Sequence, residues 1–224
     1  MRTFVVSDIH GNDDAFRKAL KTVHLKKTDR LILLGDYIDR GFDSKAVLDT
    51  IFLLREYGFD LICLKGNHEQ MLLDALEDPD KLNNWLMNGG NETLSSFLTS
   101  SIHKIPAKYI DLLESFRLYY EYEQYIFVHA ALNMRIADPF SDVQTILWSR
   151  SQNELLDYGW LGERILIHGH TPTMEQEIIN NFEDSYPIKC IDNGVFVKKH
   201  GYGGLCILEL ENFSLNFVHG YQKR

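Results

Sequence analysis

Five apolar runs in this chain are followed at once by Asp, His or Asn, the side chains that hold metal ions or move protons. Any one Asp or Asn there could instead be a turn former or a helix cap. Capping does not explain histidines after four of the runs, so we interpret the set as a metal site. The residues that follow the runs are Asp8 and His10, Asp36, Asn67 and His68, His129, and His168 and His170.

The mixture of carboxylate, imidazole and amide groups suits manganese, iron or zinc better than a thiolate-bound structural zinc. Asp8 and His10 are two residues apart, so in extended chain their side chains point the same way. A carboxylate such as Asp36 can bridge two ions. Two metals roughly 3.5–4 Å apart clamp the attacking and leaving oxygens of an in-line displacement at phosphorus and acidify a bound water. The pattern therefore predicts a two-metal phosphoester hydrolase.

The elements that must position these residues are short strands alternating with amphipathic helices, which predicts a βαβαβ start with parallel strands. Residues 69–117 are predicted to be helical, with a break at residues 88–91, and strand patterns return after Pro187. We therefore expect α/β sheets layered with helices rather than one doubly wound sheet. The polar residues should converge beyond the carboxyl ends of the strands. Strand-length apolar runs occur at 3–7, 31–34, 61–64, 125–128, 165–167, 189–191, 204–210 and 215–218.

Composition limits the class of protein. The 224 residues fit one domain, which we predict to span 1–224, and 45% hydrophobic with 25% charged residues excludes a disordered or fibrous chain. A net charge of −9, with no long run of Lys or Arg, argues against general nucleic-acid binding. No apolar run approaches a membrane span or a signal peptide, so we expect a cytoplasmic protein. Cys63, Cys190 and Cys206 lie singly in apolar runs and are expected to be reduced.

Three strings in the first third of the chain resemble the motifs of a known family. They are Asp8-Ile9-His10-Gly11, Gly35-Asp36-Tyr37-Ile38-Asp39-Arg40-Gly41 and Gly66-Asn67-His68-Glu69. The likeness continues through His129, Trp148-Ser149-Arg150 and Gly169-His170-Thr171-Pro172 to Asp192-Asn193-Gly194. Together they resemble the metallophosphoesterase superfamily and, within it, the small bacterial and phage-type serine/threonine phosphatases of the phosphoprotein phosphatase family. The resemblance implies a layered α-β-β-α sandwich with two mixed β-sheets.

The resemblance also implies a role for each matching residue. His68 resembles the general acid that protonates the leaving oxygen, with Asp39 orienting it. Arg40 and Arg150 resemble the guanidinium groups that bind the phosphoryl oxygens, although Arg150 could also form a surface salt bridge. The cofactors would be two divalent ions, manganese first, with iron or zinc as alternatives. One ion would be held by Asp8, His10 and Asp36, and the other by Asp36, Asn67, His129 and His170.

The leading interpretation is a metal-dependent phosphatase acting on phosphoserine or phosphothreonine in proteins and peptides. Hydrolysis of a dinucleoside polyphosphate, such as diadenosine tetraphosphate, stays open because relatives with the same core perform it. The intact Asp39-Arg40 pair favours the phosphoprotein branch. A non-catalytic binding scaffold would predict lost ligands, whereas every expected ligand is present. Lys65 and the pair at 130–131 depart from the common family pattern, but neither change removes a ligand.

Three further features are left open by the pattern itself. One Gly separates His168 from His170, so spacing cannot choose the ligand. The family's Gly-His-Thr-Pro string chooses His170, and His168 is predicted to be a packed or hydrogen-bonding imidazole beside it. The glycine pair at 89–90 is predicted to break a helix, with contact to an anion as the alternative. Asp192 is predicted to form a turn or to support a ligand.

Overall fold

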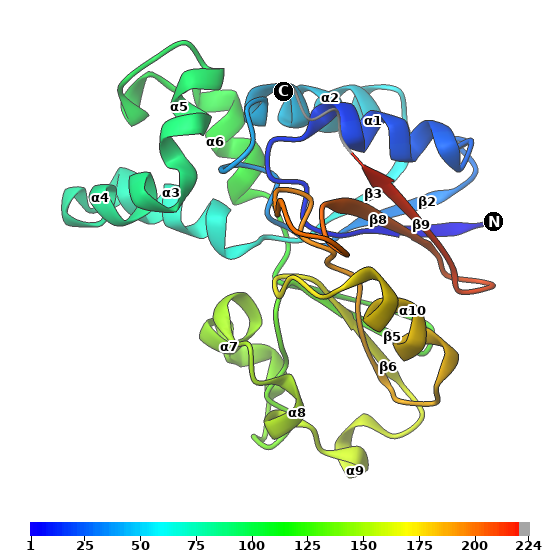
Figure 1. Ribbon diagram of the computed structural model, residues 1–224. Coiled ribbons are helices and arrows are strands. Elements are labelled where there is room, and N and C mark those ends of the chain that lie inside the picture. The colour runs from blue at the N-terminus through cyan, green and yellow to red at the C-terminus, as the bar shows by residue number, and fades with distance from the viewer. Residues whose placement is uncertain (220–224) are drawn as a thin grey trace.

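Residues 1–219 are described by the computed structural model, and their strands form two mixed sheets (Figure 1). The first sheet has the order β3-β2-β1-β8-β9. Its first three strands in the chain run parallel, whereas β8 is antiparallel to β1 and β9 is antiparallel to β8. The strands are β1 Thr3–Val6, β2 Arg30–Leu33, β3 Asp60–Cys63, β8 Gly204–Glu209 and β9 Ser214–His219.

The second sheet is built from the middle of the chain, in the order β4-β5-β6-β7. β5, β6 and β7 run parallel, and β4 is antiparallel to β5 at one edge. The parallel strands of both sheets therefore end in loops that can carry polar groups to one place. The strands are β4 Tyr119–Tyr122, β5 Tyr125–Val128, β6 Ile165–His168 and β7 Ile188–Cys190.

Side chains alternate between the two faces of each sheet, as the pleat requires. In β1, Phe4 and Val6 pack with the helices, whereas Val5 belongs to the layer between the sheets. In β5, Phe127 joins Val5 in that layer, and Ile126 packs with the helices of the second sheet. Each sheet is therefore buried on both faces. The predicted α-β-β-α sandwich with two mixed sheets is confirmed.

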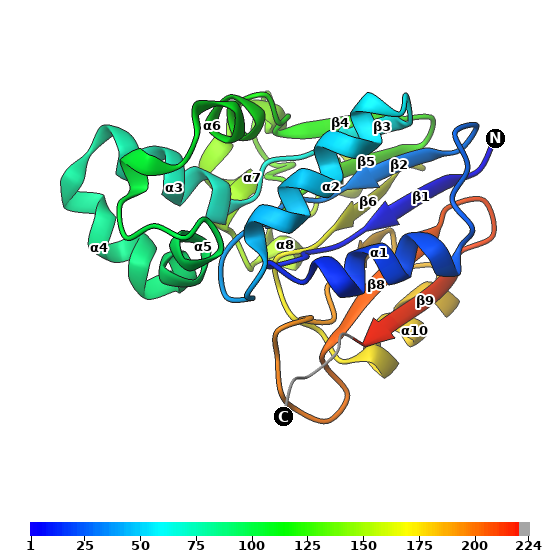
Figure 2. The ribbon, with the colours of Figure 1, turned by 90° about the horizontal axis from the view of Figure 1, so that it is seen from above.

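Helices α1 to α6 lie on the side of the first sheet, and α7 to α9 lie beyond the second (Figure 1, Figure 2). Among residues 1–219 no helix is both long and apolar enough to cross a membrane. The helices are α1 Asp13–Thr22, α2 Ser44–Glu56, α3 Asn67–Glu77, α4 Leu82–Trp85, α5 Asn91–Ser96, α6 Ala107–Glu114, α7 Val143–Trp148, α8 Gln152–Leu155, α9 Tyr158–Leu161 and α10 Glu175–Glu183.

Two elements differ in detail from the sequence pattern. β4 was not predicted as a separate strand, because alternate residues of this edge strand are exposed and it lacks an apolar run. The predicted helix break is present, but it lies inside a wide turn, Leu86–Gly90, that links α4 to α5. Gly89 has φ 112° there, which an L-residue with a side chain rarely adopts. The glycine pair therefore changes the direction of the helical segment without ending it.

Candidate metal centre

The loops that follow β1, β2, β3, β5 and β6 bring the six predicted metal ligands together at the carboxyl ends of the strands. Each ligand residue is at most 8% exposed. Burial of this many ionisable groups is costly unless each is paired, neutral or bound to a cation. The site is thus a place where charge must be compensated. The six residues are Asp8, His10, Asp36, Asn67, His129 and His170.

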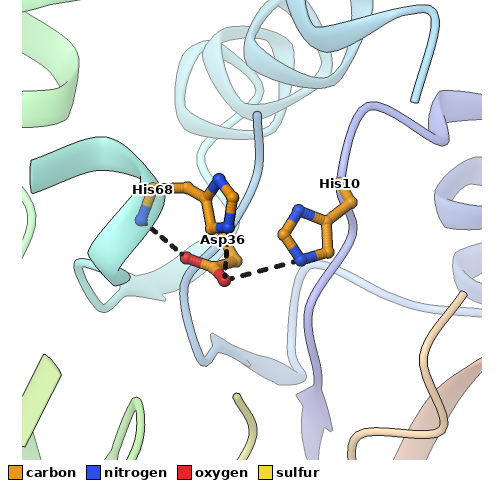
Figure 3. Close-up of side chains that lie close together, drawn as sticks. All are labelled: His10, Asp36 and His68. Carbon is orange, nitrogen blue, oxygen red and sulfur yellow. Dashed lines mark hydrogen bonds and ion pairs between the residues drawn. The ribbon is translucent and has the colours of Figure 1, made fainter. Parts of the chain in front are cut away.

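Asp36 lies at the middle of the site, between the rings of His10 and His68 (Figure 3). Its Oδ2 is 3.5 Å from Nε2 of His10 and 3.9 Å from Nε2 of His68, while Oδ1 is 3.5 Å from Nε2 of His129. Two sets of side chains could each hold a metal ion, His10 with Asp36 and His68, and Asp36 with His129 and His170. Both sets contain Asp36. This geometry supports the bridging role, which stays a prediction.

Hydrogen bonds to the backbone decide which nitrogen of each ligand histidine is free. Nδ1–H of His10 donates to the carbonyl of Ile38 at 3.0 Å, and Nδ1–H of His129 donates to that of Leu34 at 2.9 Å. Burial lowers the pKa of both imidazoles well below the ordinary value, so each carries one proton, on Nδ1. Nε2 of each ring therefore presents a lone pair to the site. This is the arrangement typical of metal-binding histidines.

Several donor atoms converge on Nε2 of His129, as they would around a cation. Its Nε2 lone pair faces Oδ1 of Asn67 at 3.0 Å and Oδ1 of Asp36 at 3.5 Å. Nδ1 of His170 lies 3.1 Å from the same nitrogen. The Nε2 lone pair and the two oxygens are electron-pair donors, which repel one another at these distances unless a positive ion lies among them. The residues present thus fit a divalent cation at this position.

The buried carboxylates of the centre also need a positive charge nearby to stay ionised. Burial raises the pKa of Asp8 well above its usual range, and the neighbouring carboxylates of Asp192 and Asp36 raise it further. The pKa of Asp36 is raised by burial and by Glu69. Two cations would reverse these shifts and keep the carboxylates ionised as ligands.

Five of the predicted site residues adopt a backbone conformation that is uncommon outside glycine. Their φ angles are 44° for His10, 51° for Asp36, 70° for Asp39, 66° for Arg40 and 67° for His170. Residues held in this region cost of order 1–3 kcal/mol each, so the surrounding structure must impose the conformation. Strain gathered in this way is common at functional sites.

Glu69 imposes the conformation of the loop after β2, a role that the motif alone did not indicate. Its carboxylate accepts the backbone N–H groups of Asp36 at 2.9 Å, Tyr37 at 2.8 Å and Gly66 at 2.9 Å, and it is fully buried. The available signal was its position as the third residue of α3, where an acidic side chain reaches back to the helix start. Glu69 thereby joins the loops after β2 and β3.

His68 and Asp39, the predicted acid and its partner, are in contact. Nδ1 of His68 and Oδ2 of Asp39 are 2.8 Å apart, and both residues are fully buried. Nε2 of His68 is buried and forms no hydrogen bond within residues 1–219. The ring therefore has one nitrogen held by Asp39 and one available to the site. The catalytic roles of both residues stay predictions.

The two predicted phosphate-binding arginines are placed differently. Arg40 is half-buried, and its guanidinium carbon lies 4.3 Å from the ring centre of Phe196, which also packs edge-on against His10 at 4.8 Å. Arg150 is exposed, at the rim of a cavity of about 440 Å³ whose lining includes His168. Phe196 was missed by sequence analysis, because nothing in its local string links an aromatic ring to the site. Both phosphate contacts stay predictions.

Asp8 is held beside His170 and belongs to neither group of side chains that could hold a metal ion. Both of its oxygens accept the backbone N–H of His170 at 3.1 Å. A Cβ at Gly169 would lie 2.1 Å from Oδ1 of Asp8, so only glycine fits before this histidine. Asp192 accepts the backbone N–H of Gly194 at 2.7 Å, which forms the predicted turn. Its negative charge also raises the pKa of Asp8. The ligand role of Asp8 stays a prediction.

His168 belongs to neither group of side chains that could hold a metal ion. Its Nδ1–H donates to the carbonyl of Gly169 at 3.0 Å, and burial lowers its pKa to about 4. His170, in contrast, faces His129. The structure thus places two histidines that spacing left equivalent in different surroundings, and the ligand role of His170 stays a prediction.

Comparison with known proteins identifies the family of this centre. A family model described as calcineurin-like phosphoesterase matches residues 1–211. The chain belongs to the calcineurin-like phosphoesterases. A solved serine/threonine phosphatase from Saccharomyces cerevisiae superposes on this phosphoesterase with a TM-score of 0.68 at 14% identity, covering 100% of this chain and 81% of that one. That likeness is one of fold.

Two curated relatives are similar over shorter segments. Serine/threonine-protein phosphatase 1 of Salmonella typhimurium is 43% identical over 89 residues, which are 39% of this chain and 38% of that protein. A symmetrical bis(5'-nucleosyl)-tetraphosphatase of Acidovorax sp. is 42% identical over 76 residues, 34% of this chain and 26% of that protein. The resemblance inferred from the motifs is confirmed, and two groups of side chains that share Asp36 could each hold a metal ion. The two names differ in substrate, so family membership leaves the substrate open.

Proposed function

We propose that this phosphoesterase removes phosphate from phosphoserine and phosphothreonine in proteins. The observation that supports this most is the buried pair of His68 and Asp39, with its 2.8 Å contact and the free Nε2 of His68. An alkoxide leaving from serine is a strong base and needs a proton in the transition state. A nucleotide phosphate leaving from an anhydride is a weak base and needs little help. A dedicated proton donor therefore favours esters of alcohols.

The remaining predicted residues bind and orient. Asp8, His10 and Asp36 would hold one divalent ion, and Asp36 with Asn67, His129 and His170 the other, with manganese first and iron or zinc as alternatives. The grouping of His10 with Asp36, and of Asp36 with His129 and His170, supports this assignment. When bound, the ions polarise the phosphoryl group and acidify the attacking water. Arg40 and Arg150 would bind the phosphoryl oxygens through their guanidinium groups.

The proton on His68 depends on the substrate. As an acid, His68 must be protonated on both nitrogens. Burial lowers its pKa well below the ordinary value, and His10 and Arg40 lower it further. The Asp39 carboxylate on Nδ1 and an anionic phosphoryl group beside Nε2 act in the opposite direction. We infer that His68 takes up its second proton when the phosphorylated substrate binds.

The second candidate is hydrolysis of a dinucleoside tetraphosphate, which the Acidovorax relative's name supports. The net charge of −9 disfavours a substrate with several negative charges. A phosphopeptide, in contrast, carries one phosphoryl group on a chain of variable charge. We therefore place the nucleotide second.

One experiment tests the proposal and the alternative together. The protein is first stripped with a chelator, and activity is then measured with added manganese on a phosphoserine peptide, p-nitrophenyl phosphate and diadenosine tetraphosphate. We expect no activity before metal is added and a higher kcat/KM for the peptide than for the dinucleotide. Full activity without metal would overturn the mechanism. A tenfold preference for the dinucleotide, about 1.4 kcal/mol of transition-state discrimination, would select the second candidate.

We also propose that residues 1–224 act as one catalytic domain. The layer between the sheets joins Val5 from the start of the chain, Phe127 from the middle and Cys206 near its end. Limited proteolysis should therefore yield no stable fragment that retains a single sheet. Such a fragment would contradict the proposal.

A further inference from the structure

Trp85, at the end of α4, binds the carboxylate of Asp39. The indole N–H lies 3.0 Å from Oδ2 and 3.2 Å from Oδ1, and Trp85 is fully buried. These two residues are 46 positions apart in the chain. The donor is therefore delivered to the carboxylate by the packing of the helical segment and not by the local string around Asp39.

Thr93, in α5, holds Asp39 at two points. Its hydroxyl donates to Oδ1 of the carboxylate at 2.7 Å and accepts the backbone N–H of Asp39 at 2.9 Å. Ser44, the first residue of α2, supports the same group, with its Oγ 3.0 Å from the Thr93 hydroxyl. Asp39 has φ 70°, so its backbone needs such external support. Figure 2 shows α5 close to the start of α2, where these residues meet.

The glycine pair of the same segment allows this close approach. A Cβ at Gly89 would lie 2.5 Å from the backbone nitrogen of Arg40, and a Cβ at Gly90 would lie 2.6 Å from the ring of Trp85. The turn between α4 and α5 therefore rests directly on the loop that carries Asp39 and Arg40. Packing on this loop therefore accounts for the glycine pair.

With these contacts, the Asp39 carboxylate has a fixed direction. Oδ1 accepts the Thr93 hydroxyl, Oδ2 faces Nδ1 of His68 at 2.8 Å, and the indole of Trp85 lies across both oxygens. A carboxylate held in this way keeps the proton on Nδ1 of His68 and directs Nε2 into the site. Rotation of the carboxylate would move Nε2 away from the leaving oxygen.

We propose that Trp85 and Thr93 are positioning residues that aim His68 through Asp39, and that they matter most for substrates whose leaving oxygen needs a proton. The inference rests on the proposed role of His68 as proton donor. It adds two side chains outside the motif loops that adapt this centre to esters of alcohols. We call residues 82–96, which contain both side chains, the positioning segment.

Thr93→Val and Thr93→Ser form the decisive pair, because valine has nearly the shape of threonine without its hydroxyl and serine keeps the hydroxyl. With manganese present, Thr93→Val should lower kcat on a phosphoserine peptide by about 10–100-fold, as expected for a misplaced catalytic group. Its kcat on p-nitrophenyl phosphate, whose leaving group is a weak base, should fall less than about threefold. KM and bound metal should stay unchanged. Thr93→Ser should restore kcat on the peptide to within about threefold.

Thr50→Val is the matched control. The Thr50 hydroxyl donates to Oδ1 of Asp13 at 2.6 Å, so this variant also breaks a buried hydroxyl–carboxylate contact, but between α1 and α2. It should lower thermal stability without changing the ratio of activities on the two substrates. Trp85→Phe, which removes the indole N–H, should repeat the leaving-group pattern of Thr93→Val and serves if Thr93→Val does not fold.

Equal loss on both substrates in Thr93→Val, or a Thr93→Ser variant as impaired as Thr93→Val, would overturn the inference. His68→Asn separates this failure from a failure of the proposed function. If His68→Asn shows the leaving-group dependence and the Thr93 variants do not, only the positioning role is wrong. If His68→Asn itself affects all leaving groups equally, the acid role is wrong and the inference falls with it.

Discussion

Arg40 and Arg150 approach the site from opposite halves of the molecule. Arg40 follows β2, is half-buried and lies against the ring of Phe196, in a loop held by Glu69 and by the positioning segment. Arg150 lies between α7 and α8, and its side chain is exposed at the rim of a cavity. The Arg40 side chain is thus held in place before substrate binds, whereas the Arg150 side chain can adopt several rotamers.

This difference has an energetic consequence. An exposed Arg loses up to about 2 kcal/mol of rotamer freedom when a ligand fixes it, whereas a guanidinium already held in place loses less. A preorganised donor can stabilise the transition state without reorganising. We therefore expect the loops of the first sheet to determine kcat, and Arg150 to adjust the affinity for the substrate.

The largest expected effect tests whether every side chain on the Arg150 side of the site is as adaptable as Arg150. His170→Ala should remove one of two bound metals and lower turnover by at least roughly 10³-fold, because a metal supplies several kcal/mol of charge stabilisation. His168→Ala is the control, and it should keep both metals with at most about a 10–100-fold loss. Metal content per chain and kcat are measured in both. Two metals in His170→Ala beside one in His168→Ala would show that the wrong histidine was assigned.

The next effect compares the arginines directly. Arg40→Ala should lower kcat by about 10²–10³-fold, the usual result of removing one preorganised donor to the reacting group. Arg150→Ala should raise KM by about fivefold and change kcat little, because an exposed ion pair contributes about 1 kcal/mol or less. Both are measured on a phosphoserine peptide. Equal effects on kcat would remove the distinction between the two halves.

The third prediction concerns the support of the Arg40 loop. Glu69→Gln replaces a charged acceptor of several backbone N–H groups by a weaker one and puts an unpaired amide N–H₂ beside them, so it should destabilise folding by about 2 kcal/mol. Glu77→Gln, an exposed change on the same helix, should alter stability by less than about 0.5 kcal/mol. Urea unfolding of the metal-free protein measures both. If the two variants unfold alike, Glu69 does not hold the loop.

The smallest expected effect comes from a variant that leaves the Arg40 guanidinium as loosely held as that of Arg150. Phe196→Leu removes the aromatic face under the Arg40 guanidinium, a contact worth about 0.5–1 kcal/mol, and should raise KM by about two- to fivefold. Tyr57→Leu removes an exposed ring near Lys27 and should leave KM unchanged. KM is measured on the same peptide with manganese. An unchanged KM in Phe196→Leu would mean that burial, and not the ring, holds Arg40.

Much of the fold and most of the candidate site could be predicted from the sequence. Strand-length apolar runs locate eight of the nine strands of residues 1–219, and β4 escapes because an exposed edge strand carries no such run. The candidate ligands could be named because each follows a strand directly, so that the parallel sheet alone directs it to the carboxyl edge. Asp36 and His129 are examples, 93 residues apart in number yet both placed by the strand before them.

Only the tertiary structure decided which side chains hold the predicted site in shape. Thr93 reaches Asp39 across 54 residues, and Phe196 reaches Arg40 from a loop that follows the second sheet. It also placed His170 against His129, whereas His168, two residues earlier, contacts the backbone of Gly169. Local strings specify the direction of a strand and the type of a side chain. Contacts between distant elements depend on how helices pack on the sheets and on the few glycines that let backbones approach, and no local pattern records that packing.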